Sequence, residues 1–177
     1  MEPTSERLVL RTAAPTDLDF FFELRNHPEI LALPRRESRP RSDVERQLWR
    51  WVERWQELGF GTWTVFDRQT EEPLGRVELD PIGPGWSGIA PDEVELGCIV
   101  HPMHWNKGIA TEATELAIAD FFDRTDRNRL VALTTTDNQP SLRALAKLGL
   151  HRCGETQHES DETTYELFEL VRTPGSV

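Results

Sequence analysis

Apolar and polar positions change period several times along the chain, and each change marks a predicted element. Residues 7–12 alternate and predict a short strand. Residues 16–25 have a broad apolar side and predict a helix. Residues 42–58 repeat apolar side chains at helical spacing, with Ser42 as the expected N-cap and Gly59 as the residue that ends the helix.

From residue 60 onward the period is two. Residues 60–67 and 74–79 alternate on either side of a turn-rich segment and predict a hairpin. A third strand is expected over residues 93–100, and its two faces differ in chemistry. One face carries Val94, Leu96, Cys98 and Val100, and the other carries Glu93, Glu95, Gly97 and Ile99.

The C-terminal half alternates helical and strand patterns. Helices are expected over residues 107–124 and 139–148, and strands over 129–135, 150–157 and 163–171. Gly149 occupies the place of a C′ glycine after the second of these helices. The whole order predicts one α+β domain over residues 1–177, with its core at about 6–171. We expect a mixed, mostly antiparallel sheet of about seven strands with four helices.

The charge composition limits the kinds of partner that the protein is expected to bind. The 177 residues contain 20 Lys and Arg against 31 Asp and Glu, which gives a net charge of −11. This charge disfavours nucleic acids and anionic membranes as partners. No leader pattern and no long apolar run occur, so a soluble, cytoplasmic protein is expected. Cys98 and Cys153 have no metal-ligand spacing and are expected to be reduced core thiols.

The segment most informative about chemistry joins the strand 93–100 to the helix 107–124 through a tight loop. The first N–H groups of a helix are unpaired and point outward, so an anion can bind there. Gly108 lets the backbone approach such an anion closely. The Rossmann and P-loop glycine patterns are absent, so the sequence predicts a phosphate site of another type.

These motifs resemble the GNAT superfamily of N-acetyltransferases, and within it the ribosomal-protein-alanine (RimJ/RimL-type) branch. The resemblance runs from Arg7 to about Leu170. Its most specific part is Glu95-Leu-Gly-Cys-Ile-Val-His-Pro followed by Trp105-Asn-Lys-Gly-Ile-Ala-Thr-Glu-Ala. The segment from Thr135 to Ser141 and the Lys147-Leu-Gly-Leu run also match the branch pattern.

The resemblance implies that acetyl-CoA lies between splayed strands, here 93–100 and 129–135, with its pyrophosphate on the turn before the helix 107–124. The amine acceptor would enter from the opposite side of the sheet. Asn106 stands where the branch usually has glycine, so we expect a left-handed backbone there. The residues implied in cofactor binding are Cys98, Ile99, Val100, Trp105, Asn106, Lys107, Gly108, Ile109, Ala110, Thr111, Asn138, Ser141 and Lys147.

The implied activity is that of an acetyl-CoA-dependent N-acetyltransferase, an acyltransferase of the EC 2.3.1 class, acting directly on a primary amine. The acceptor is either a protein N-terminus or a small-molecule amine. Glu95 is the expected catalytic carboxylate that helps to deprotonate the amine. Many relatives carry a tyrosine at the position of Leu145, so Ser141 is the hydroxyl expected near the thiolate. No metal is expected.

Structural alternatives stay open for several of these residues. Glu95 is otherwise an exposed strand carboxylate, and Asn138 a helix cap. His101 and His104 are expected to be ordinary loop histidines. The tryptophans Trp51, Trp55 and Trp63 are core residues, or one of them faces the acceptor. The loop with Arg35, Arg36, Arg39 and Arg41 is either solvated or attracts an acidic acceptor or a phosphate.

Two alternatives also remain for the whole protein. One is a noncatalytic acyl-CoA-binding or regulatory module on the same fold, because Leu145 lacks the hydroxyl. The other is a homodimer that uses the tryptophan-rich helix 42–58 as its interface.

Overall fold

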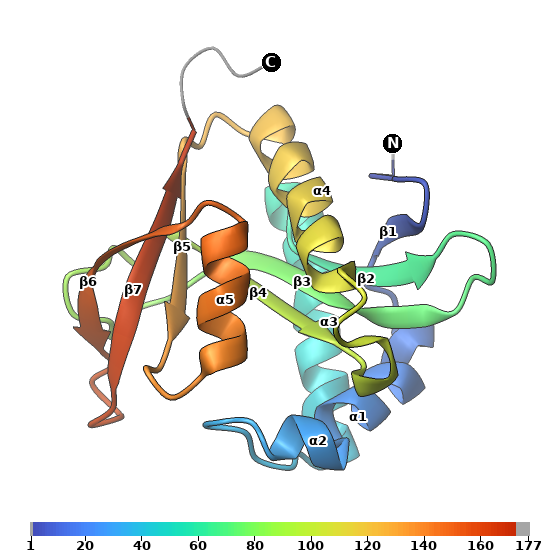
Figure 1. The fold of residues 1–177 in the computed structure, drawn as a ribbon, viewed down its shortest axis with the longest axis horizontal. Coiled ribbons are helices and arrows are strands. Elements are labelled where there is room, and N and C mark those ends of the chain that lie inside the picture. The colour runs from blue at the N-terminus through green and yellow to red at the C-terminus, as the bar shows by residue number, and fades with distance from the viewer. Residues whose placement is uncertain (1, 173–177) are drawn as a thin grey trace.

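The computed structural model describes residues 2–172 and contains one seven-stranded sheet in the order β1-β2-β3-β4-β5-β7-β6 (Figure 1). The strands are β1 (Leu8–Thr12), β2 (Thr62–Asp67), β3 (Pro73–Pro81), β4 (Val94–Val100), β5 (Arg129–Thr134), β6 (His151–Gln157) and β7 (Thr164–Val171). The helices are α1 (Leu18–Asn26), α2 (Pro28–Leu31), α3 (Arg41–Leu58), α4 (Ile109–Arg124) and α5 (Gln139–Lys147). Short 3₁₀ turns, η1 (Pro15–Asp17) and η2 (Pro102–His104), precede α1 and α4.

Strands β4 and β5 form the one parallel pair of the described sheet, and they meet at a single residue pair, Glu95 with Val131. On its other edge, β4 pairs with β3 along its whole length, from Val94 to Val100. The carboxyl half of β4 therefore diverges from β5 while it stays anchored to β3. The splay expected between these two strands is present.

Helices cover both faces of the sheet. Figure 1 shows α4 and α5 in front of the strands and α3 behind them. The larger core joins the sheet to α4 and α5 through residues such as Ala113, Phe121 and Leu145. A smaller core packs α1, α2 and α3 against Ile99 of β4. The opposite faces of β4 thus belong to different cores, as its alternation predicted.

Most element boundaries agree with the sequence pattern. Gly59 and Gly149 follow the ends of α3 and α5 with left-handed φ angles of 74° and 77°, as expected for terminating glycines. The expected helix start at residue 107 is two residues early, because α4 begins at Ile109 with the left-handed Gly108 as its N-cap.

Three local expectations were wrong. Pro40, not Ser42, is the N-cap of α3. The one-turn helix α2 was not expected; it begins directly at Pro28, whose ring fixes φ at a helical value and whose missing N–H costs nothing in a first turn. Cys153 is exposed on β6, whereas Cys98 is partly buried against the larger core.

Candidate active site

Glu95 lies where β4 and β5 meet, on the sheet face that also carries the charged residues of β3. Its register partner is Asp80, and Glu78 is the partner of the neighbouring Gly97. Burial raises the pKa of Glu95 to about 7, and the nearby carboxylates of Glu78 and Asp80 raise it in the same direction. The guanidinium groups of Arg76 and Arg36 oppose that shift without cancelling it. A carboxyl group with such a pKa can accept a proton near neutral pH.

Gly97 leaves a notch beside Glu95. A Cβ built on Gly97 would make only ordinary contacts, at 3.8 Å from Cβ of Glu78. Glu78, the register partner of Gly97, lines a cavity of about 540 Å³ between the sheet and the helices α1 and α3. The cavity is lined by Phe21, Leu24, Arg25, Arg36, Arg39, Asp43, Val44, Arg46, Gln47, Arg50, Trp51, Arg76, Glu78 and Ile99.

Of the three tryptophans named as candidates, Trp51 lines this cavity. Its indole Nε1 donates to Oε1 of Glu78 at 3.2 Å, and the guanidinium of Arg76 lies 4.9 Å from its ring centroid. Trp63 is fully buried, and Trp55 donates to the carbonyl oxygen of Thr62 at 2.7 Å. Trp51 is therefore the one of the three that lines the cavity, although it is only 5% exposed and belongs to the smaller core.

The gap between β4 and β5 exposes backbone groups of β4. The N–H of His101 donates to the carbonyl oxygen of Leu74 in β3 at 2.8 Å, so it points toward β3. Backbone N–H groups alternate in direction along a strand, and this hydrogen bond therefore shows which of them face β3. By this alternation the N–H groups of Cys98 and Val100 point away from β3, toward the diverging β5. These are two of the residues expected to bind the cofactor.

The turn between β4 and α4 has the backbone predicted for an anion site. Asn106 and Gly108 have left-handed φ angles of 59° and 78°, so the prediction for Asn106 is confirmed. Trp105 holds this turn against β4, because its indole Nε1 donates to the carbonyl oxygen of Val100 at 2.7 Å. The exposed Lys107 and the first turn of α4, which contains Ile109, Ala110 and Thr111, follow directly.

An ion pair at this turn was missed in the sequence analysis. Arg7, at the start of the chain, pairs with Glu112 in the first turn of α4 and donates through Nη1 to the carbonyl oxygen of Lys107 at 3.1 Å. Ser5 also donates to Glu112. These contacts span 100 residues of sequence or more, so no local pattern could have indicated them. They fix the turn from the β1 side.

The remaining expected residues lie on or beside α5. Asn138 is its N-cap and accepts from the backbone N–H of Ser141 at 3.3 Å, so the capping alternative is confirmed. Ser141 is partly buried in the first turn, and Lys147 is exposed in the last. Leu145 is 6% exposed and belongs to the larger core. The helix therefore directs Ser141 and Leu145, one turn apart, toward the sheet.

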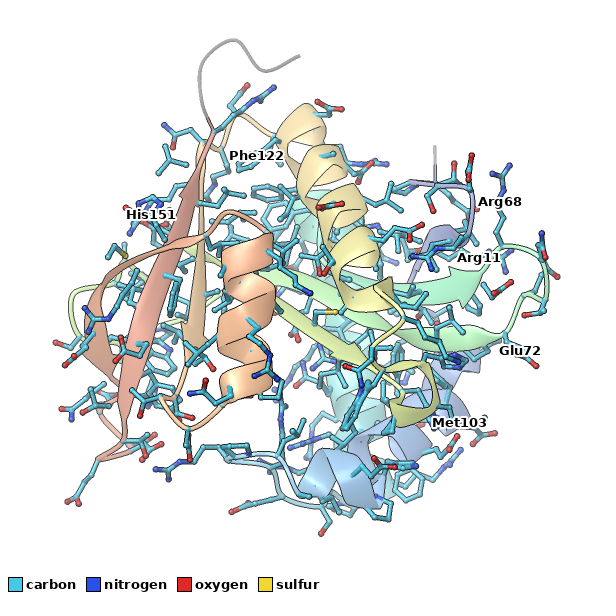
Figure 2. The ribbon with its side chains drawn as sticks, in the orientation of Figure 1. Arg11, Arg68, Glu72, Met103, Phe122 and His151 are labelled. Carbon is cyan, nitrogen blue, oxygen red and sulfur yellow. The ribbon has the colours of Figure 1, made fainter. Side chains whose placement is uncertain are left out.

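The first histidine after β4, His101, has hydrogen-bond partners within the protein. His101 is buried, its Nε2 lies 3.1 Å from Oε1 of Glu23, and its Nδ1 accepts from the N–H of Met103. Figure 2 shows Met103 itself at the tip of this loop, away from the sheet. Within residues 2–172, no group of three or more His, Cys, Asp and Glu side chains is arranged to hold a metal ion. Burial raises the pKa of the Cys98 thiol, which keeps it protonated.

A sequence model of the acetyltransferase (GNAT) domain family matches residues 7–151. The chain belongs to the GNAT acetyltransferase family. The matched range includes β4, the turn before α4 and the whole of α5, which carry the candidate site residues described above.

Two curated relatives come from Bacillus subtilis. The uncharacterized N-acetyltransferase YoaA is 26% identical over 155 residues, which cover 85% of this chain and 82% of YoaA. The uncharacterized protein YkkB is 29% identical over 118 residues, and the match covers 60% of this chain and 62% of YkkB.

Three solved structures share the GNAT fold over nearly the whole chain. An acetyltransferase from Agrobacterium tumefaciens has a TM-score of 0.81 at 19% identity, covering 97% of this chain and 95% of its own. The ribosomal-protein-S5-alanine acetyltransferase from Vibrio fischeri has a TM-score of 0.76 at 17% identity, covering 100% of both chains. An aminoglycoside acetyltransferase in complex with coenzyme A has a TM-score of 0.76 at 16% identity, covering 93% of this chain and 95% of its own.

Proposed function

We propose that this GNAT protein transfers the acetyl group of acetyl-CoA directly to a primary amine. The observation that carries the proposal is the single-pair contact between β4 and β5, which opens the sheet beside Glu95. On one face of the sheet lies the cavity lined by Glu78 and Ile99, and at the end of β4 lies the turn that leads into α4. Amine and cofactor can therefore reach the same point of β4 from different directions.

The first proposed step is loss of a proton from the acceptor ammonium. Glu95, with its pKa raised to about 7, takes this proton directly or through a water molecule. The freed amine nitrogen then attacks the thioester carbonyl carbon. No enzyme nucleophile takes part, in agreement with the protonated state of the Cys98 thiol.

The second step moves charge onto oxygen and then onto sulfur. The N–H groups of Cys98 and Val100 are our candidates to stabilise the negative charge on the carbonyl oxygen. The C–N bond forms, the nitrogen releases to water the extra proton that it then carries, the C–S bond breaks, and coenzyme A leaves as a thiolate. Ser141 at the start of α5 is proposed to donate a hydrogen bond or a proton to that thiolate.

We propose that the thirteen residues expected to bind the cofactor do so around the β4 opening, the turn before α4 and the start of α5. At the turn, the first N–H groups of α4 and the exposed Lys107 supply donors and charge for the pyrophosphate. The aminoglycoside acetyltransferase of the same fold has been solved with coenzyme A, which supports coenzyme A as a ligand of this fold.

The acceptor is proposed to be either a protein N-terminus or a small-molecule amine. The Vibrio fischeri relative is named for an alanine of a ribosomal protein, and the other acts on aminoglycosides by its name. The RimJ/RimL-type resemblance of the motifs favours an N-terminal amine. The described residues include no helix long and apolar enough to cross a membrane. The homodimer, the cytoplasmic location and the lack of nucleic-acid partners stay predictions.

The test is release of coenzyme A thiol from acetyl-CoA in the presence of a panel of peptide and small-molecule amines. We expect turnover that requires both an amine and acetyl-CoA, with a stoichiometric acetylated product seen by mass spectrometry. Tight binding of acetyl-CoA without turnover by any amine would instead identify a noncatalytic acyl-CoA-binding module.

A further inference from the structure

The cavity between the sheet and the helices α1 and α3 is strongly basic in a protein that is acidic overall. Its lining contains six arginines and two carboxylates, whereas the whole chain has a net charge of −11. The arginines come from four separate segments: Arg25 from α1, Arg36 and Arg39 from the loop before α3, Arg46 and Arg50 from α3, and Arg76 from β3. The fold gathers these charges in one place.

Most arginines elsewhere in the described chain have a carboxylate partner, as Arg7 has Glu112 and Arg127 has Asp92. In the cavity the two carboxylates are already used, because Asp43 pairs with Arg46 and Glu78 pairs with Arg76. The four other cavity arginines, Arg25, Arg36, Arg39 and Arg50, have no carboxylate within 4.0 Å among residues 2–172. Their charge is available to a ligand.

Two of these four guanidinium groups are costly to leave unpaired. Nη1 of Arg25 is buried and has no hydrogen-bond partner in the described structure. Burial, together with Arg76 and Arg25, lowers the pKa of Arg36 to about 10. A buried charged donor without an acceptor is destabilising, and such groups persist where a ligand or an ion completes them.

The loop that carries Arg36 and Arg39 is held in place before any ligand binds. The side-chain amide of Asn26, at the end of α1, accepts from the N–H of Arg39 at 2.8 Å and donates to its carbonyl oxygen at 3.1 Å. The same amide donates to the carbonyl oxygen of Phe22 at 3.0 Å. The backbone of Arg39 is therefore fixed, which reduces the entropy that this part of the loop loses on binding.

From these contacts we infer that the acceptor amine carries an anionic group, a carboxylate or a phosphate, which binds to the arginines Arg25, Arg36, Arg39 and Arg50 of this cavity. The inference rests on the proposed acetyl transfer and names its substrate class. The planar guanidinium fork matches the oxygens of either anion. Glu78 lines the cavity and is the register partner of Gly97, two residues from Glu95 along β4, so the anion would bind close to the proposed catalytic carboxylate. Polyamines and other cationic acceptors would meet like charge in this cavity.

The first experiment compares amidated dipeptides that share an N-terminal alanine amine and differ only in the charge of the second side chain. The pairs are glutamate against glutamine and phosphoserine against serine, with lysine as the cationic case. We expect kcat/KM to be at least tenfold higher for the anionic member of one pair or both, and lowest for lysine. The pair that shows the preference identifies carboxylate or phosphate as the group recognised.

Arg36→Gln is the main variant, and Arg35→Gln is its matched control. Both remove one positive charge from the same loop, but Arg35 is exposed and does not line the cavity. We expect Arg36→Gln to reduce the anionic preference at least tenfold through KM, and Arg35→Gln to leave it unchanged. A wild-type protein that acetylates the neutral or lysine peptides equally well would overturn the inference while leaving the proposed acetyl transfer intact.

Binding of anions without turnover gives a second readout. Inorganic phosphate and succinate should raise the melting temperature of the wild-type protein and of Arg35→Gln more than that of Arg36→Gln, since only the last variant lacks a cavity arginine. Equal shifts in all three proteins would rule out the arginine site. If the shifts differ as expected but no amine is acetylated, the anion site stands and the proposed transferase activity fails.

Discussion

Glu95 has an unusual position for a carboxylate, because it shares one face of two adjacent strands with Glu78 and Asp80. Three acidic side chains so close together cannot all be ionised cheaply, and burial makes the most enclosed of them the weakest acid. The same arrangement raises the pKa of Asp80 to about 6, although Arg54 lies 3.5 Å away. The pKa of Glu95, the proposed base, is thus raised by burial and by the carboxylates of the neighbouring strand.

Replacing Glu95 with glutamine should reveal this role in the pH profile. We expect Glu95→Gln to lower kcat at neutral pH by roughly 10²-fold or less, the usual contribution of a general base. The wild-type kcat/KM should rise with pH through about 7, because the Glu95 carboxylate forms there. The variant should not show this rise. The deficit should narrow at higher pH, where free amine is abundant.

Acetyl-CoA affinity serves as the control and should hardly change, because the Glu95 side chain lies on the acceptor side of β4. A variant with full activity at pH 7 would show that water and positioning suffice, and that Glu95 is structural.

Ser141 can be tested without disturbing its helix, because Asn138 caps α5 through the backbone N–H of Ser141 and not through its hydroxyl. We expect Ser141→Ala to lower kcat by roughly tenfold, the cost of one hydrogen bond to a developing charge. The deficit should be the same across the pH range, in contrast to that of Glu95→Gln. A parallel recovery of both variants at high pH would argue against a separate role at the thiolate.

Restoring a hydroxyl one turn later is not expected to compensate. Leu145 is packed into the larger core, and a tyrosine there would exceed the space available.

Among the elements, the turn before α4 combines a backbone constraint with a proposed binding role. Gly108 has a left-handed φ angle of 78°, and a Cβ there would meet Nη2 of Arg7 at an ordinary 3.6 Å. Space therefore permits a side chain, while the backbone disfavours it by about 1–2 kcal/mol. Gly59, with φ of 74° and nothing within 4 Å of a built Cβ, provides the same constraint far from the proposed cofactor site.

We therefore expect Gly108→Val and Gly59→Val to lower the melting temperature to a similar extent, but only Gly108→Val to weaken acetyl-CoA binding in calorimetry. Lys107→Ala should cost about 1 kcal/mol or less, and the loss should shrink at high salt because Lys107 is exposed. Unchanged cofactor affinity in Gly108→Val would mean that the pyrophosphate binds elsewhere.

For the molecule as a whole, the raised pKa of Glu95 links catalysis to stability. The folded protein holds the Glu95 proton up to a pH of about 7, whereas the unfolded chain releases it near its ordinary value of 4.5. The folded state therefore binds more protons between these two pH values, and the free energy of unfolding falls as pH rises through this window.

Glu95→Gln removes this dependence while it keeps the shape of the side chain. We expect the variant to match the wild type near pH 4.5 and to be more stable at pH 8, by about 2–3 kcal/mol. Chemical denaturation of both proteins across this range provides the measurement. A constant stability difference over the range would show that Glu95 is not the titrating group.

Local patterns along the chain were sufficient to predict most helices and strands and part of the proposed site. Alternation of residue types predicted the two faces of β4, because side chains along a strand point to opposite faces of the sheet. Glycines predicted the ends of α3 and α5, because a left-handed backbone after a helix favours glycine. The left-handed backbone at Asn106 followed from the same kind of local reasoning. The motif around β4 and α4 also identified the family, which the match over residues 7–151 confirms.

Only the tertiary structure determined which charged groups lie close together and how deeply they are buried. The raised pKa of Glu95 depends on burial and on the carboxylates of Glu78 and Asp80 in the neighbouring strand. The Arg7–Glu112 ion pair joins the residue before β1 to the first turn of α4 across more than 100 residues. The basic cavity draws its arginines from two helices, a loop and a strand, of which the sequence indicated only the loop. Charge interactions depend on distance in space and on burial, and neither quantity is defined until the chain has folded.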